Sequence, residues 1–216
     1  MYKAVIFDLD GTLLNTLPSL AHSCNTVLES LGHPTHAQDN YRLMVGRGIS
    51  NLVLQMLPED VRERQHAAAL EQYYDTYERN LYYQLDPYPG ILELLSDLKS
   101  SGIKLAVLSN KGQDYTEEIV ANILPDTFDH VLGASEKYPL KPDPASANAI
   151  ADLLQLEKNT ILFVGDSNVD MMTAKNAGMT ACGVAWGFRT REELLKSGAD
   201  FIAEKTEDIL EIVLND

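Results

Sequence analysis

From Gly90 to the C-terminus, short apolar runs alternate with segments whose apolar residues have helical spacing. We expect helices over residues 91–100, 115–123, 145–154, 171–177, 190–196 and 207–214, and strands over residues 104–108, 128–132, 160–164, 180–184 and 201–203. Regular alternation of this kind gives a parallel sheet with helices on both faces. The pattern therefore predicts an α/β fold built on a doubly wound parallel sheet.

The segment before Gly90 interrupts this alternation. Residues 4–7, Ala-Val-Ile-Phe, are short, apolar and rich in β-branched and aromatic side chains, which predicts a first buried strand. No convincing strand follows until residue 86, and helical spacing appears over residues 17–31, 48–57 and 65–85. We expect an α/β core from residues 1–14 plus 87–216, and a helical unit inserted as residues 15–86.

Composition excludes several classes of partner. The formal net charge of −15 argues against binding to nucleic acids or anionic membranes, because both require a basic face. We see no apolar segment long enough to cross a bilayer and no signal peptide at Met1. The two cysteines, Cys24 and Cys182, fall in different expected units. We therefore expect no disulfide and a reducing, cytoplasmic environment.

Polar residues follow the ends of several expected strands, and ligands of open α/β sheets bind beyond the carboxyl ends of the strands. The residues are Asp8 and Asp10, then Ser109, Asn110 and Lys111, then Lys141 between prolines, then Asp166 and Asp170. Each alone has a simpler explanation, such as a solvated turn, a helix cap or a surface lysine. Their shared position favours one common pocket.

The order of these residues resembles that of the haloacid dehalogenase superfamily of phosphotransferases. The motifs are D-x-D-G-T-L from Asp8, Ser109 after an apolar strand, K-P-x-P from Lys141, and G-D-x-x-x-D ending at Asp170. Residues 109–111 and the Gly-Val-Ala-Trp-Gly stretch at 183–187 are most similar to phosphoglycolate-phosphatase-type members. The resemblance implies a Rossmann-like core and an α-helical cap inserted after the first motif. Such a cap can close over a small substrate and exclude water.

The resemblance also implies catalytic roles. Asp8 is expected to be the nucleophile that forms a phosphoaspartyl intermediate, and Asp10 the general acid and base. An aspartate at position 10 favours phosphatases and phosphomutases, because the dehalogenase branch lacks it. Ser109 and Lys141 are expected to stabilise the phosphoryl oxygens. The remaining core residues predicted to bind substrate are Gly11, Thr12 and Asn110.

A magnesium ion is expected among the carboxylates, since converging negative charges repel strongly unless a cation joins them. Oxygen ligands and a phosphate substrate suit Mg²⁺. The predicted ligands are Asp8, the carbonyl of Asp10, and Asp166. Asp170 is expected to stand behind them or to hold Lys141.

The inserted unit holds one further candidate site, the Val45-Gly46-Arg47-Gly48 segment. We expect Arg47, flanked by Gly46 and Gly48, to bind a substrate carboxylate with bidentate geometry. The alternative is an exposed arginine in a hinge-like loop. Helix packing is favoured over a role in a site for several tyrosines, and these are Tyr73, Tyr74, Tyr77, Tyr82 and Tyr83.

Together these features predict a Mg²⁺-dependent phosphatase, a monomer or homodimer, that acts on a small phosphorylated metabolite. The leading candidate is 2-phosphoglycolate. The alternatives are a sugar phosphomutase, which could use the same core residues, and a pyrophosphatase or nucleotide phosphatase. A non-catalytic phosphate-binding protein is the least favoured, because it would not need Asp10.

Overall fold

A computed structural model describes residues 1–215, and its centre is a parallel sheet of six strands in the order β5-β4-β1-β6-β7-β8. The strands are β1 (Ala4–Phe7), β4 (Lys104–Gly112), β5 (His130–Ala134), β6 (Ile161–Gly165), β7 (Thr180–Val184) and β8 (Phe201–Ala203). Strand β1 pairs with β4 on one side and β6 on the other. The chain therefore reverses its direction of winding beside β1, where ligands of such sheets bind.

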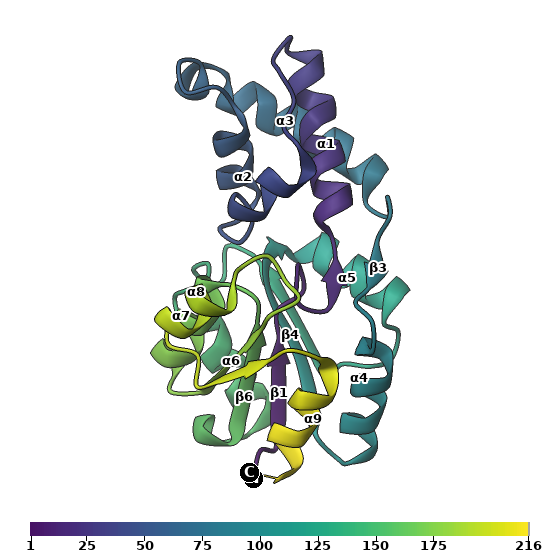
Figure 1. Ribbon diagram of the computed structural model, residues 1–216, viewed down its shortest axis with the longest axis vertical. Coiled ribbons are helices and arrows are strands. Elements are labelled where there is room, and N and C mark those ends of the chain that lie inside the picture. The colour runs from purple at the N-terminus through teal and green to yellow at the C-terminus, as the bar shows by residue number, and fades with distance from the viewer. Residues whose placement is uncertain (216) are drawn as a thin grey trace.

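Helices cover both faces of the sheet (Figure 1). The side chains of β1 alternate, so that Val5 and Phe7 join one apolar core while Ala4 and Ile6 join the other. Three helices pack on the first core, α4 (Ile91–Ser100), α5 (Gln113–Ile123) and α9 (Thr206–Asn215). Three pack on the second, α6 (Ala145–Leu154), α7 (Asn168–Ala177) and α8 (Arg191–Lys196). The predicted doubly wound α/β fold is confirmed.

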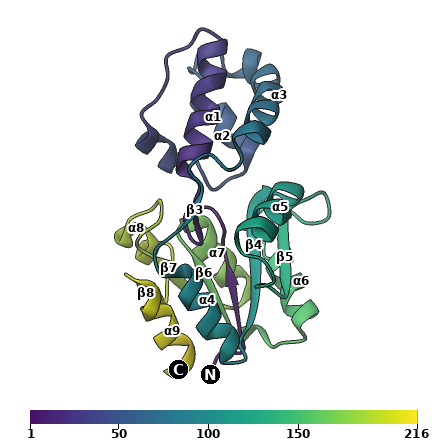
Figure 2. The ribbon, with the colours of Figure 1, turned by 90° about the vertical axis from the view of Figure 1, so that its right-hand side faces the viewer.

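The remaining helices gather beyond the carboxyl ends of the strands, away from both termini (Figure 2). They are α1 (Leu17–Ser30), the 3₁₀ helix η1 (Gln38–Leu43), α2 (Ile49–Met56) and α3 (Arg62–Asn80). Tyr41, Tyr73 and Tyr77 are fully buried here, together with apolar residues such as Leu28 and Met56. Burial of such large aromatic surfaces stabilises this helical unit.

A short antiparallel ribbon joins the helical unit to the sheet. Strand β2 (Leu14–Asn15) pairs with β3 (Asp86–Pro87), with Leu14 opposite Pro87 and Asn15 opposite Asp86. The chain thus enters and leaves the helical unit through two adjacent strands. This ribbon is too short to be recognised from sequence alternation.

The elements depart from expectation in their boundaries. Helix α3 ends at Asn80, before the expected residue 85, and the chain beyond it turns through Gln84 at a φ of 46°. Leu81 and Leu85 continue the apolar spacing beyond the end of the helix, and both are buried. Strand β4 continues past residue 108 to Gly112. Among the described residues, no helix has the length and apolar composition to span a bilayer, and Cys24 and Cys182 are buried free thiols.

Candidate functional site

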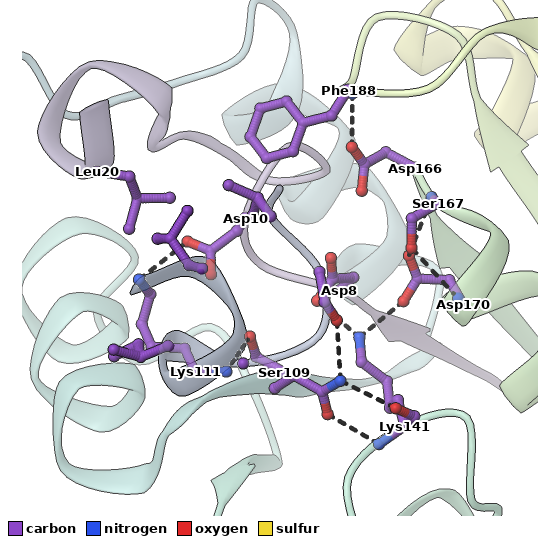
Figure 3. A pocket seen from close by; sticks show the side chains of 16 residues that line it. Asp8, Asp10, Leu20, Ser109, Lys111, Lys141, Asp166, Ser167, Asp170 and Phe188 are labelled. Atoms are coloured by element: carbon purple, nitrogen blue, oxygen red, sulfur yellow. Dashed lines mark hydrogen bonds and ion pairs between the residues drawn. The ribbon is translucent and has the colours of Figure 1, made fainter. Parts of the chain in front are cut away.

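A pocket opens where the carboxyl ends of β1, β4 and β6 face the helical unit (Figure 3). Its polar side chains come from the end of β4, from the loops after β1 and β6 and from the segment between β5 and α6, and apolar side chains of the helical unit contribute to its walls. The lining residues are Asp8, Asp10, Leu20, Val45, Gly46, Gly48, Ile49, Leu52, Ser109, Asn110, Lys111, Lys141, Asp166, Ser167, Asp170 and Phe188. The structure thus brings the motifs of the expected core together.

An irregularity in β4 presents residues 109–111 to this pocket. Leu108 pairs with Leu132 and Gly112 with Ala134, so three residues of β4 lie opposite Gly133 alone. A bulge of this kind bends a strand and redirects its side chains. The side chain of Asn110 then ties two loops together, since its Nδ2 donates to the carbonyl oxygens of Gly46 at 2.9 Å and Lys141 at 3.0 Å. The amide of Asn110 is therefore engaged in structure, and its backbone stays the part predicted to face a phosphoryl group.

Lys141 lies at the centre of a buried ion-pair network. Its Nζ donates to Asp8 Oδ1 at 2.8 Å, to Asp170 Oδ1 at 2.7 Å and to the carbonyl oxygen of Leu108 at 2.9 Å. The other oxygen of Asp170 accepts hydrogen bonds from Ser167, at 3.0 Å from its backbone N and 2.6 Å from its Oγ. Ser167 and Asp170 form a capping box that begins α7. Both oxygens of Asp170 are thus occupied, and Asp170 holds Lys141.

Asp166 is fixed from the opposite side of the pocket. Its Oδ2 accepts a hydrogen bond from the backbone N of Phe188 at 2.6 Å. Asp166 can approach the backbone at Gly187 and Gly11 only because both residues lack a side chain. A Cβ placed on Gly187 would lie 2.2 Å from the Cβ of Asp166, and one on Gly11 would lie 2.3 Å from its Oδ2. Gly11 also has a φ of +89°, which favours glycine. Gly11 therefore shapes the site from behind Asp166 and does not line the pocket.

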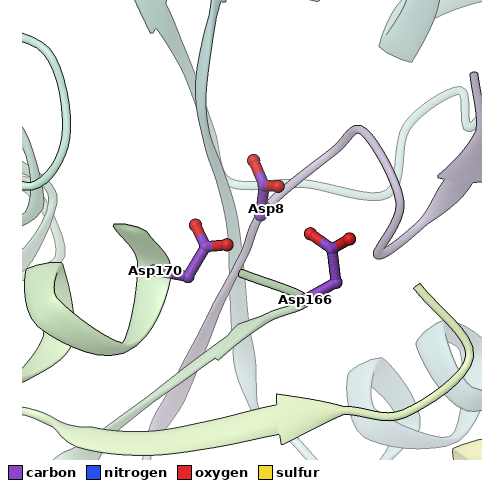
Figure 4. Close-up of side chains that lie close together, drawn as sticks. All are labelled: Asp8, Asp166 and Asp170. Atoms are coloured by element: carbon purple, nitrogen blue, oxygen red, sulfur yellow. The ribbon is translucent and has the colours of Figure 1, made fainter. Parts of the chain in front are cut away.

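Three carboxylates, those of Asp8, Asp166 and Asp170, each offer an oxygen within 4.8 Å of the others (Figure 4). Burial, opposed by Lys141 and reinforced by Asp170 and Asp10, raises the pKa of Asp8 to about 7. Burial and the charges of Asp170 and Asp8 also raise the pKa of Asp166 well above its usual value. The protein's own cations therefore leave this cluster electrostatically unbalanced.

The formal charges of the side chains that line the pocket also show an excess of negative charge. With Asp10 included, four carboxylates line the pocket against two ammonium groups, Lys111 and Lys141, which leaves two negative charges when all are ionised. Oxygen ligands and a deficit of two charges fit a divalent cation. The cluster is thus suited to a metal ion between Asp8 and Asp166.

Lys111 is a functional candidate whose role the sequence motifs did not predict. It is buried, and its Nζ lies 3.1 Å from Asp10 Oδ1 and donates to the hydroxyl of Tyr77 at 2.6 Å. Tyr77 belongs to α3, where it is buried in the apolar core of the helical unit as expected, and its hydroxyl in addition contacts Lys111. Helical spacing predicts a core position for Tyr77, but nothing in the sequence links it to a lysine 34 positions away.

Other predicted residues take different places. Gly46 and Gly48 line the pocket, whereas the intervening Arg47 is exposed and is not among the lining residues. Thr12 is buried and is not among the lining residues, and its carbonyl oxygen accepts a hydrogen bond from Trp186 Nε1 at 3.1 Å. Ser109 is buried within the pocket wall, and its Oγ accepts a hydrogen bond from the backbone N of Lys111.

Contacts from the core also hold the end of η1 and the loop that follows it. Arg189 donates from its guanidinium to the carbonyl oxygens of Arg42, Leu43 and Val45, at 3.0 Å for Val45. Arg42 returns a hydrogen bond of 2.8 Å to the carbonyl oxygen of Gly187. These bonds keep the helical unit against the pocket in this structure.

Comparisons with known proteins agree with this geometry. Residues 5–184 match the family model of haloacid dehalogenase-like hydrolases. A phosphoglycolate phosphatase of Vibrio parahaemolyticus is 31% identical over 98% of this chain and 96% of its own length. Another, of Mannheimia succiniciproducens, is 32% identical and covers 98% of both chains.

Solved structures show the same fold. A crystal structure from Lactobacillus delbrueckii subsp. bulgaricus has a TM-score of 0.95 at 30% identity and covers 100% of this chain and 99% of that one. A hydrolase of the haloacid dehalogenase-like family from Streptococcus pneumoniae has a TM-score of 0.87 at 25% identity, with 98% of both chains covered. This chain therefore belongs to the haloacid dehalogenase-like hydrolase family.

Proposed function

We propose that this protein is a phosphatase that hydrolyses a small phosphate monoester, with 2-phosphoglycolate as the leading substrate. The observation that carries the proposal is that Asp8 and Asp10 face one buried pocket together with two ammonium groups. A carboxylate nucleophile beside a carboxyl acid and base fits phosphoryl transfer in two steps. The relatives named phosphoglycolate phosphatase, which match over nearly their full length, support the choice of substrate.

The two steps assign a role to each carboxylate. An oxygen of Asp8 attacks phosphorus while the ester bond to the leaving oxygen breaks, and Asp10 gives its proton to that leaving oxygen. Asp10, now ionised, takes a proton from water as the water attacks the phosphoaspartyl phosphorus. Asp8 and inorganic phosphate are released. Positioned proton transfer of this kind contributes about 10²–10⁴-fold to the rate.

Lys141 and the β4 bulge serve the phosphoryl group. We propose that the Lys141 ammonium, the Ser109 hydroxyl and the backbone N–H of Asn110 face the phosphoryl oxygens. Preorganised donors in a buried site are worth more than the same donors in water, because they need no reorganisation during the reaction. The 2.8 Å contact between Lys141 and Asp8 supports this arrangement, since it places positive charge beside the nucleophile.

We propose Mg²⁺ as the resident cation, held by the carboxylates of Asp8 and Asp166 and the carbonyl oxygen of Asp10. When bound, Mg²⁺ would supply positive charge against the phosphoryl oxygens and the carboxylates. The raised pKa values of Asp8 and Asp166 support this assignment, because a cation would restore their ionised forms.

We also propose that residues 15–86 act as a cap that closes over the substrate. Bonds between the units support a closing motion about the β2–β3 ribbon, among them Asn110 to Gly46 at 2.9 Å and Lys111 to Tyr77 at 2.6 Å. Leu20, Ile49 and Leu52 would exclude water from the closed pocket. We place the activity in the cytoplasm, which the two buried free thiols support.

A panel of phosphorylated metabolites tests this proposal. Phosphate release and isomerisation are measured for 2-phosphoglycolate, sugar phosphates, nucleotides and pyrophosphate, with Asp8→Asn as the inactive control. We expect the highest kcat/KM with 2-phosphoglycolate. Isomerisation of a sugar phosphate without net phosphate release would favour a phosphomutase. A folded protein that releases phosphate from none of them contradicts the proposal.

A further inference from the structure

The two ammonium groups of the pocket differ in how fully they are used. A lysine ammonium has three N–H donors. Lys141 spends all three, on Asp8, Asp170 and the carbonyl oxygen of Leu108. Lys111 has two partners among the described residues, Asp10 at 3.1 Å and the hydroxyl of Tyr77 at 2.6 Å. Lys111 therefore keeps one donor for a ligand, and it lines the pocket.

Lys111 also lies on a different side of the pocket from Lys141. In Figure 3, Lys141 reaches between Asp8 and Asp170, whereas Lys111 stands beside Asp10 and near Leu20. Asp8 and Lys141 mark where a phosphoryl group would bind. Asp10 marks the leaving oxygen, so that Lys111 faces the part of the substrate beyond the ester bond.

We propose that Lys111 binds a carboxylate carried by the leaving group, and so selects phosphorylated short hydroxy acids as substrates. This inference rests on the proposed phosphatase activity and names the residue that recognises its substrate class. Arg47, the cation expected for this task, is exposed and does not line the pocket. Lys111 is buried, so that its charge acts on a ligand with little screening by solvent.

The neighbours of Lys111 hold its ammonium in place. The Tyr77 hydroxyl accepts one N–H of Lys111, and the centroid of the Tyr77 ring lies 4.8 Å from Nζ. Tyr73 stacks on Tyr77 with ring centroids 5.4 Å apart, which restricts the Tyr77 ring. A lysine otherwise loses much side-chain entropy when it binds an anion. Here the packing of α3 has already fixed the side chain, which favours binding.

The position of Lys111 also limits the length of the substrate. Its Nζ lies 3.1 Å from Asp10, the group that would protonate the leaving oxygen. When the carboxylate is carried by the carbon next to the ester oxygen, the carboxylate can reach Lys111 while the ester oxygen faces Asp10. A carboxylate or phosphate at the far end of a sugar or nucleotide would instead meet the apolar wall at Leu20, Ile49 and Leu52. The inferred class is thus the phosphate esters of 2-hydroxy acids.

The test compares two substrates that differ in the carboxylate, 2-phosphoglycolate and 2-hydroxyethyl phosphate. Lys111→Met and Lys111→Gln should lower kcat/KM for 2-phosphoglycolate roughly 10–150-fold more than for 2-hydroxyethyl phosphate, the range expected for a lost charged hydrogen bond. Lys111→Arg, which keeps the charge, should retain part of the discrimination. Lys158→Met makes the same chemical change at an exposed position before β6 and should leave the ratio of the two substrates unchanged. Thermal unfolding confirms that each variant is folded.

A second measurement does not depend on turnover of the acidic substrate. Glycolate should inhibit hydrolysis of 2-hydroxyethyl phosphate competitively in the wild type, and Lys111→Gln should weaken that inhibition. Equal losses on both substrates with unchanged glycolate inhibition would overturn the inference while leaving the phosphatase intact, since Lys111 would then only position Asp10. Loss of discrimination in Arg47→Met alone would also overturn it. If the wild type hydrolyses neither ester, the proposed function itself fails.

Discussion

Lys141 and Asp8 lie 133 residues apart in the chain, yet their Nζ and Oδ1 atoms meet at 2.8 Å in the interior of the protein. The contact joins the loop before α6 to the end of the central strand β1. A buried ion pair is costly to break from one side only, because the remaining charge stays desolvated. The same pair therefore concerns both the proposed chemistry and the stability of the fold.

Replacement of Lys141 by Met should destabilise the protein by about 3–5 kcal/mol, the usual cost of removing one partner of a buried pair. Asp8 and Asp170 would both lose their ammonium partner. Activity should also fall to background. Chemical denaturation measures the stability change, and Lys158→Met serves as the exposed control. An unfolding free energy close to that of the wild type would show that the pair contributes little.

Replacement of the two aspartates of the first motif, Asp8 and Asp10, should block different steps of the reaction. Asp8→Asn should form no phosphoenzyme, because it lacks the attacking carboxylate. Asp10→Asn should still be phosphorylated by a substrate with a good leaving group, such as p-nitrophenyl phosphate, but should lose the phosphoryl group slowly. Rapid-quench labelling with radioactive phosphate distinguishes them. A labelled Asp8→Asn protein would contradict the assignment of the nucleophile.

Mg²⁺ should stabilise the protein more at pH 8 than at pH 5. Without metal, burial raises the pKa of Asp8 from its ordinary value of 3.8 to about 7, so the folded state binds more protons than the unfolded state between these values. Stability from this group is therefore present at low pH and is lost as pH rises toward 7. A cation that binds the ionised carboxylates should offset this loss.

The measurement is the melting temperature with EDTA or with Mg²⁺ at both pH values. Asp166→Asn should remove most of the Mg²⁺-induced rise. EDTA should abolish hydrolysis in the wild type, and Ca²⁺ should not replace Mg²⁺, because its larger and looser coordination suits the pocket less. If the Mg²⁺-induced rise in melting temperature is equal at both pH values, or is as large in Asp166→Asn as in the wild type, the cation binds elsewhere.

Gly187→Ala should damage the site by a steric clash, although the φ of Gly187 does not itself favour glycine. The added Cβ would lie 2.2 Å from the Cβ of Asp166 and 2.5 Å from the carbonyl oxygen of Gly11. Overpacking of this kind costs about 1–3 kcal/mol and should displace Asp166. Gly112→Ala is the matched control, since its Cβ would meet Tyr115 at an ordinary 3.6 Å. Phosphatase activity and the Mg²⁺-induced shift in melting temperature should fall in the first variant and persist in the second.

The sequence predicts the core of the site well because its residues sit in short motifs at strand ends. Asp8, Ser109 and Asp166 converge as the parallel sheet requires, since the adjacent strands β1, β4 and β6 bring their carboxyl ends together. Lys141 joins them from the segment between β5 and α6. Local pattern is enough for such residues.

Contacts between the helical unit and the core were not predictable in this way. Tyr77 of α3 meets Lys111 of β4 through tertiary packing, which helical spacing does not encode. Arg47 suggested an anion site because it lies between two glycines. The structure instead turns the glycines toward the pocket and leaves the arginine at the surface.

The pairing of Leu14 with Pro87 and of Asn15 with Asp86 has a consequence for how this chain can change. Because the two ends of the helical segment leave the sheet side by side, a segment of another length or shape could be spliced between them without moving any of the six strands. The groups expected to break and form bonds to phosphorus would stay where they are. The walls that the helical unit contributes to the pocket can therefore change while the groups on the strands, Lys111 included, stay in place.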